Sequence, residues 1–150
     1  MPLSPTGPDL SFLDSLPSEN EEIASVWATA LSDYASGIVS VPLAPGTAEG
    51  AGAALEGLLI GTLPLGLAAG ATGIFDAPMI AFGGLIALGM LPSGFAGVPP
   101  VVPFSAMVLP PGVLYPDAES AKSAIGALIY AWFATGTATP ISGGPPIPWS

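Results

Sequence analysis

The sequence predicts a mainly α-helical domain, a small bundle of about four helices with long ordered coil and an extended arm at each end. Apolar residues recur at helical spacing in four segments, and each segment begins at a residue that favours a helix start. The 20 glycines and 19 prolines are too many for unbroken helices. Because 51% of the residues are hydrophobic, these glycines and prolines punctuate a packed fold and do not mark a disordered chain.

Charge excludes several classes of protein. The 150 residues carry a net charge of −10, with a single cation, Lys122, and no histidine. Binding to nucleic acid requires cations that neutralise phosphates, so we predict no nucleic-acid partner. The chain has no cysteine, which excludes disulfides.

Residues 1–17 are expected to form an extended arm, because four prolines interrupt them. The arm nevertheless carries several large apolar residues, more than a free tail needs. We therefore predict that it lies on a protein surface, with Phe12 and Leu13 as candidate interface residues.

The first helix is predicted over residues 19–38. Ser18 is placed at the N-cap and Glu21 at the third helical position, the spacing of a capping box. One apolar face follows at spacings of three and four, consisting of Ile23, Trp27, Leu31, Tyr34 and Ile38.

The second and third helices lie in a stretch of low charge. The second is predicted to begin with Thr47 as its N-cap and to end before Pro64, since the residue before a proline avoids helical backbone. The third is predicted to begin with Asp76 as a cap and to close at Pro92.

The last third of the chain combines a proline-rich insert, a helix and a second arm. Residues 91–116, within a helical domain of residues 18–136, are expected to form ordered coil or short edge strands. Asp117 is predicted to cap the last helix and Gly136 to follow its end. The apolar face of that helix is predicted to consist of Ala121, Ile125, Leu128 and Trp132. Residues 137–150 form the second extended arm.

No constellation of residues indicates catalysis. Without histidine or cysteine there is no Ser-His-Asp triad, thiol nucleophile or usual zinc site. Glu49 and Glu56 share a helix face, but a solvated face explains them better than a catalytic carboxylate pair. Asp76 is better explained by helix capping than by a raised pKa and a catalytic role. We predict a non-enzymatic protein with no catalytic residue, cofactor or metal.

The acids at the start of the first helix, Glu19, Glu21 and Glu22, have two interpretations. They complement the positive end of the helix dipole, and carboxylates are also the ligands of hard cations. The sequence favours neither strongly, and the prediction of no metal rests on the first interpretation.

Residues 57–116 contain one charged side chain, Asp76, and such a stretch must be covered by protein or by lipid. Residues 58–75 and 77–98 are long enough to span a membrane. Their prolines and glycines, and the lack of flanking Lys or Arg, argue against spans. A small integral membrane protein, such as a holin-like lysis protein, is the alternative to a subunit of a large assembly.

The two ends of the chain resemble small structural proteins of tailed-phage virions. The resemblance lies in residues 26–42 (VWATALSDYASGIVSVP), 131–140 (AWFATGTATP) and 145–150 (PPIPWS). It implies a structural subunit located in the virion, as a tail, baseplate or connector component. The implied partners are copies of the chain itself, in a homo-oligomer, and other virion structural proteins.

Candidate interface residues follow from this expectation. We predict that Trp149 inserts into a pocket on a neighbouring subunit, because terminal residues are ordered only when they are bound. The alternative is that the second arm folds back on its own domain. The full set of candidates is Trp149, Pro148, Ile147, Phe12, Leu13 and Trp132.

Overall fold

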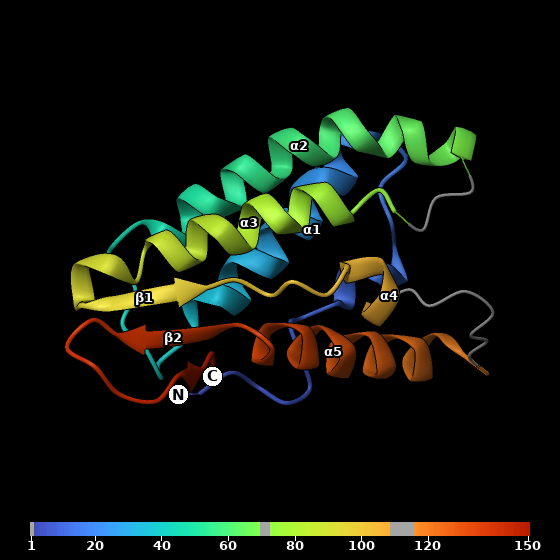
Figure 1. Ribbon diagram of the computed structural model, residues 1–150. Coiled ribbons are helices and arrows are strands. Elements are labelled where there is room, and N and C mark those ends of the chain that lie inside the picture. Colours follow the sequence, from blue (N-terminus) through green and yellow to red (C-terminus); the bar gives the residue numbers. More distant parts are fainter. Residues whose placement is uncertain (1, 70–72, 109–115) are drawn as a thin grey trace.

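The protein is mainly helical, as predicted, and also carries a small sheet (Figure 1). The computed structural model describes residues 2–69, 73–108 and 116–150. Within them the helices are α1 (Asn20–Ser36), α2 (Thr47–Ala69), α3 (Asp76–Leu88), α4 (Phe104–Val108) and α5 (Ala118–Ala134). The strands are β1 (Phe95–Val98), β2 (Thr137–Pro140) and β3 (Ile147–Pro148), and two 3-10 turns are η1 (Ser11–Asp14) and η2 (Leu91–Ser93).

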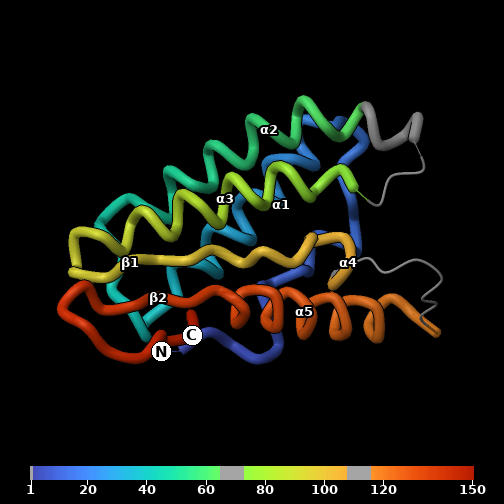
Figure 2. Tube along the Cα trace, viewed as in Figure 1, coloured from blue at the N-terminus to red at the C-terminus, as the bar shows by residue number. Residues whose placement is uncertain are grey.

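The chain forms a helical layer on a sheet and a long helix. Helix α2 packs on α1 and α3, and α3 packs in turn on β1 (Figure 1). The strands are antiparallel in the order β1-β2-β3, and Phe95 is paired with Pro140. Figure 2 shows how β2 continues from the end of α5, so that helix and strand form one long edge of the molecule.

Aromatic rings connect the elements through the core. Phe133 of α5 makes edge contacts with Tyr34 of α1 and Phe82 of α3, at centroid distances of 5.2 and 6.2 Å. Trp132 extends the cluster to Phe104 of α4, at 5.6 Å. All but Tyr34 are exposed by 2% or less, so the core joins four helices.

Helix α1 begins later than predicted, and the expected capping box is absent. Glu19 occupies the N-cap position with extended backbone (φ −93°, ψ 136°), and no side chain caps the helix. Ser18 therefore lies one residue outside the helix, where its hydroxyl does not reach the free N–H groups. The acids Glu21 and Glu22 do lie in the first turn, where they complement the helix dipole.

Helix α2 begins at Thr47 but continues through Pro64, where we had expected it to stop. Proline donates no hydrogen bond, so the carbonyl of Ile60 loses its helical partner. Ile60 and Pro64 are both exposed, and water can replace the missing donor. Solvent exposure thus explains why the helix tolerates the proline.

Helix α5 confirms the predicted residues at both ends and corrects the predicted apolar face. Asp117 is the N-cap, and its carboxylate accepts a 2.7 Å hydrogen bond from the Ser120 N–H. This bond lowers the pKa of Asp117. The buried face consists of Gly126, Ile129, Trp132 and Phe133, which is rotated from the predicted face. Thr135 is the C-cap, so Gly136 follows the end of the helix as predicted, although it lacks the positive φ common at that position.

The N-terminal arm packs on its own domain. Gly7 crosses Gly126 of α5 so closely that a Cβ on Gly7 would meet the Gly126 carbonyl group. The hydroxyl of Tyr34 donates a 2.6 Å hydrogen bond to the carbonyl of Ser4. Lys122 forms ion pairs with Asp14 and with a glutamate of its own helix, and the hydrogen bond with Asp14 is the main cause of its raised pKa.

The described part of the proline-rich insert contains more regular structure than coil. Residues 91–116 include η2, β1 and α4, and residues 109–115 lie outside the described part. Strand β1 is a short edge strand of the kind expected there, because its order in the sheet leaves it with one strand neighbour. Its other side lies against α3, where a Cβ on Gly97 would come within 2.6 Å of the Ala87 carbonyl oxygen.

Candidate interaction surface

The outward face of α3 is the most distinctive surface of the described chain. Met79, Phe82 and Ile86 bury one side of this helix in the core. On the opposite side Ile80 and Leu88 are each 61% exposed, one turn to either side of Gly84. No charged residue lies between Ala77 and the end of α3. A helix that is apolar on both sides presents its outer side for contact with another apolar surface.

A groove extends this face towards β1. Its volume is about 260 Å³, and every lining residue is apolar or glycine: Gly84, Ala87, Leu88, Leu91, Ala96, Gly97 and Pro99. Val98 and Val101, just beyond the groove, are 49% and 81% exposed. Monomeric proteins seldom expose contiguous apolar patches of this kind, and such patches usually mark a contact with a partner. We define the α3 face as Ile80, Gly84 and Leu88 together with this groove.

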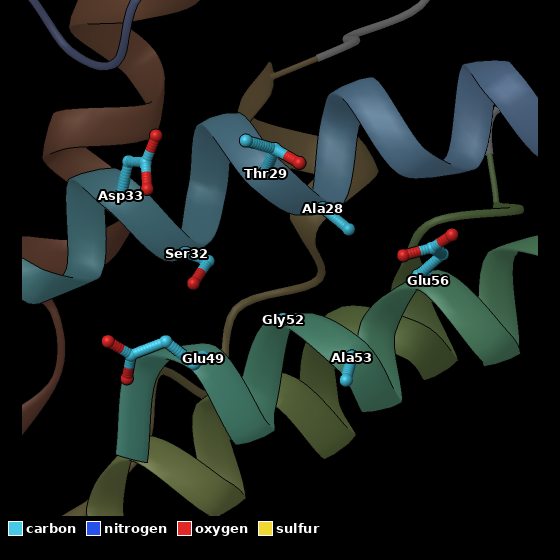
Figure 3. A pocket seen from close by; sticks show the side chains of 8 residues that line it. All are labelled: Ala28, Thr29, Ser32, Asp33, Glu49, Gly52, Ala53 and Glu56. Atoms are coloured by element: carbon cyan, nitrogen blue, oxygen red, sulfur yellow. The ribbon is translucent and has the colours of Figure 1, made fainter. Parts of the chain in front are cut away.

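The acidic residues considered as a carboxylate pair lie elsewhere, in a groove of about 240 Å³ between α1 and α2. Figure 3 shows Glu49 and Glu56 at opposite ends of this groove. Its floor is a packing contact, because the buried hydroxyl of Ser32 donates a 2.8 Å hydrogen bond to the Ala48 carbonyl. Within the described residues, no group of three acidic side chains is placed to hold a metal ion.

Asp76 has a structural role that differs from the predicted one. It is the first residue of α3, and Phe75 occupies the N-cap position without a side-chain bond. The Asp76 carboxylate instead accepts hydrogen bonds from the backbone N–H and the hydroxyl of Ser105, each of 2.8 Å. It therefore ties the start of α3 to α4.

Trp149 does not extend towards a neighbour. It is completely buried in its own chain, and its indole N–H donates a 3.1 Å hydrogen bond to the Thr137 carbonyl. The carbonyl of Ser150 accepts hydrogen bonds from the N–H groups of Val39 and Ser40. The predicted insertion into another subunit is thus wrong for this structure, because the ring fills a space that Gly136 leaves open. The alternative, an arm folded on its own domain, is observed.

The other candidate interface residues are also placed within the domain. Trp132 is buried in the core, and its indole N–H donates to the Val102 carbonyl at 3.0 Å. Phe12, Leu13 and Ile147 are half-buried against the core, and Pro148 is exposed. None of the six belongs to the α3 face.

Sequence reasoning missed the α3 face although one signal was present. Residues Ile80, Gly84 and Leu88 recur every four positions on the side opposite Phe82 and Ile86. A helix with apolar residues on both sides is either fully buried or covered by a partner. The spacing of Met79, Phe82 and Ile86 indicates the inner side, but only the structure shows that the outer side stays exposed.

One described segment, Asp76–Ser93, has the length and composition of a membrane span. Of this 18-residue window, 39% is buried inside the fold. A core helix of a soluble protein meets the same criterion, so the observation favours a membrane only weakly.

Comparison of the chain with protein-family models, with curated proteins and with solved structures found no match. The fold, the α3 face and the distribution of charge are the features of the molecule that bear on its function.

Proposed function

We propose that this chain is a non-enzymatic structural subunit of a large assembly, in which the α3 face packs against neighbouring subunits. The observation that carries the proposal is the exposure of Ile80 and Leu88, 61% each, beside an apolar groove. Exposure of such a surface to water raises the free energy, and covering it with a partner lowers the free energy. A subunit inside an assembly can keep it without aggregating.

The distribution of charge supports association through this face. Ten excess negative charges make two copies repel each other over most of their surfaces. The single cation, Lys122, already pairs with Asp14 and Glu119. Because residues 77–108 carry no charge, the α3 face is a place where neighbours meet without that repulsion.

In this proposal the helical domain, and not the terminal arms, makes the contacts with neighbouring subunits. Both arms pack on their own domain through Leu3, Leu10 and Trp149, which are buried. The favoured assembly is a tailed-phage virion, as a tail, baseplate or connector component, and the support is the resemblance of residues 26–42, 131–140 and 145–150.

A small membrane protein is the second candidate. The observation in its favour is the apolar segment Asp76–Ser93. Two observations oppose it: Phe82 and Ile86 of this segment are fully buried against the rest of the protein, and no cation flanks the segment.

The test separates particles from membranes in a lysate of the virus or cell that encodes the chain. A density gradient resolves the two fractions, and quantitative mass spectrometry measures the chain in each. We expect it in the particle fraction, at a fixed ratio to the other particle proteins and without detergent. Recovery only in the membrane fraction, with release by detergent, would support the membrane candidate and contradict the proposal.

A further inference from the structure

We infer that the partner covering the α3 face is the same face of a second copy, so that two α3 helices cross antiparallel at Gly84 about a two-fold axis. This inference rests on the proposed function and identifies the first contact of the assembly. It is argued from the shape of the helix face, from the glycine at its centre and from charge.

The face is self-complementary. Ile80 and Leu88 lie four residues before and after Gly84, so rotation by 180° about an axis at Gly84 exchanges their positions. In an antiparallel pair Ile80 of one copy then contacts Leu88 of the other, twice, as an isologous interface requires. The groove beside Leu88 offers room for the side chain of the opposing Ile80.

The packing of the described residues does not explain Gly84. A Cβ built on it meets no atom of these residues within 4 Å, whereas one on the neighbouring Gly83 would contact Pro99 and Trp132. Glycine is unfavourable inside a helix, and no close contact within the described part of the chain requires it here. A second backbone crossing over Gly84 would require it, because small residues let helices approach closely.

Two other features separate this face from alternatives. Gly57 and Gly61 on α2 are equally open, but they are not flanked symmetrically by two large exposed side chains four residues away. A lipid surface is disfavoured, because the described part of the face carries no cation for lipid headgroups and the chain has a net charge of −10. A second copy matches the face in polarity and keeps the acids outside the contact.

Sedimentation of the full chain tests the contact. Leu88→Glu places two carboxylates in each two-fold interface, and the 61% exposure of Leu88 leaves room for the change in the monomer. We expect the wild type to be dimeric at about 10 μM and Leu88→Glu to weaken the dimer by about tenfold or more. The matched control is Leu16→Glu, at a leucine that is 53% exposed between η1 and α1, and we expect it to dimerise as the wild type does.

Crosslinking tests the geometry independently. The chain has no cysteine, so a pair of introduced cysteines reports one contact. We expect Ile80→Cys/Leu88→Cys to form a disulfide-linked dimer rapidly under mild oxidation, because position 80 of one copy meets position 88 of the other while Gly84 stays in place. Within one copy the two positions lie about two helical turns apart, too far for a disulfide. Ala53→Cys/Gly61→Cys, with the same spacing around the open Gly57 of α2, is the matched control and should react slowly. Circular dichroism checks that each variant is folded.

Three outcomes would overturn the inference. They are a wild-type monomer at concentrations up to about 100 μM, equal dimerisation of wild type and folded Leu88→Glu, or faster crosslinking of Ala53→Cys/Gly61→Cys than of Ile80→Cys/Leu88→Cys. A monomer that binds neutral phosphatidylcholine vesicles through Leu88 would identify lipid as the occupant. If the inference fails while the chain is found in purified particles, the proposed function stands. If the chain dimerises through the α3 face but is absent from particles, the inference stands and the proposed function fails.

Discussion

The carboxylate of Asp76 accepts two hydrogen bonds from Ser105, one from the backbone N–H and one from the hydroxyl, both 2.8 Å long. Asp76 is the single charged residue of positions 57–116, and Ser105 lies 29 residues further along. The carboxylate also sits in the first turn of α3, where the helix dipole favours negative charge. One half-buried acid therefore holds α3 against α4, the helix within the proline-rich insert.

Substitution of Asp76 tests this structural role. Asp76→Asn keeps an oxygen for the Ser105 N–H and adds an amide donor for its hydroxyl, so we expect a loss below about 1 kcal/mol. Asp76→Leu removes both acceptors and should cost about 2 kcal/mol or more. Urea denaturation measures both changes. Loss of assembly in Asp76→Asn at unchanged stability would instead assign Asp76 a functional role.

Trp149 and Gly136 form a second testable pair. A Cβ on Gly136 would come within 2.5 Å of the Trp149 ring, so we expect Gly136→Ala to displace the ring and destabilise the fold. Trp149→Ala should cost about 3–5 kcal/mol, the usual range for a buried tryptophan. Thermal unfolding measures both. Removal of residues 140–150 should unfold the domain, and a truncated chain as stable as the wild type would show that the arm does not belong to the core.

The crossing of the N-terminal arm over α5 gives a matched pair of glycine variants. Gly126→Ala should be destabilising, because its Cβ would meet the Thr6 carbonyl. Gly50→Ala, in α2 with no atom within 4 Å of the new Cβ, should stabilise the protein by up to about 1 kcal/mol through helix propensity. Denaturant titration compares the two. Equal effects would mean that the arm does not pack on α5.

Local signals predicted part of the fold from the sequence. Asp117 caps α5 as expected, because a carboxylate just before a helix needs only the N–H groups of the next three residues. The starts of α2 and α3 also lie within one residue of the prediction, although Thr47 and Asp76 are the first helical residues and not the N-caps. Such features depend on neighbours within one turn, which the sequence displays directly.

The sheet could not be predicted, because its pairing is non-local. Phe95 pairs with Pro140, 45 positions away, and neither segment alternates between apolar and polar residues over a useful length. Pro64 likewise misled the prediction, since tolerance of a proline depends on exposure of the carbonyl four residues earlier. Residue type favours Ser18 as the N-cap of α1, but the backbone places Glu19 there.

The candidate surface was hidden for a different reason. Helix α3 is apolar on both sides, so the spacing that places Phe82 and Ile86 on the inner face does not reveal that Ile80 stays exposed. Trp149 led to the opposite error, a surface contact predicted where the side chain is buried. A terminal tryptophan after several prolines is typical of a docking arm. Its burial depends on the space beside Gly136, a tertiary fit that no spacing rule encodes.

Alkaline pH provides a test of how the N-terminal arm is held. Burial, and secondarily the charge of Tyr130, raises the pKa of Tyr34 above its ordinary value of 10.0. The folded state thus keeps a proton that the unfolded state releases, so this stability is complete below pH 10.0 and declines as the pH rises further.

Tyr34→Phe should cost about 1 kcal/mol near neutral pH through the lost bond to Ser4. It should also lose less stability than the wild type between about pH 8 and pH 11. Denaturant titrations at both pH values, with the absorbance of tyrosinate as a second readout, measure the difference; parallel losses in the two proteins would show that Tyr34 is accessible to solvent and that the arm does not cover it.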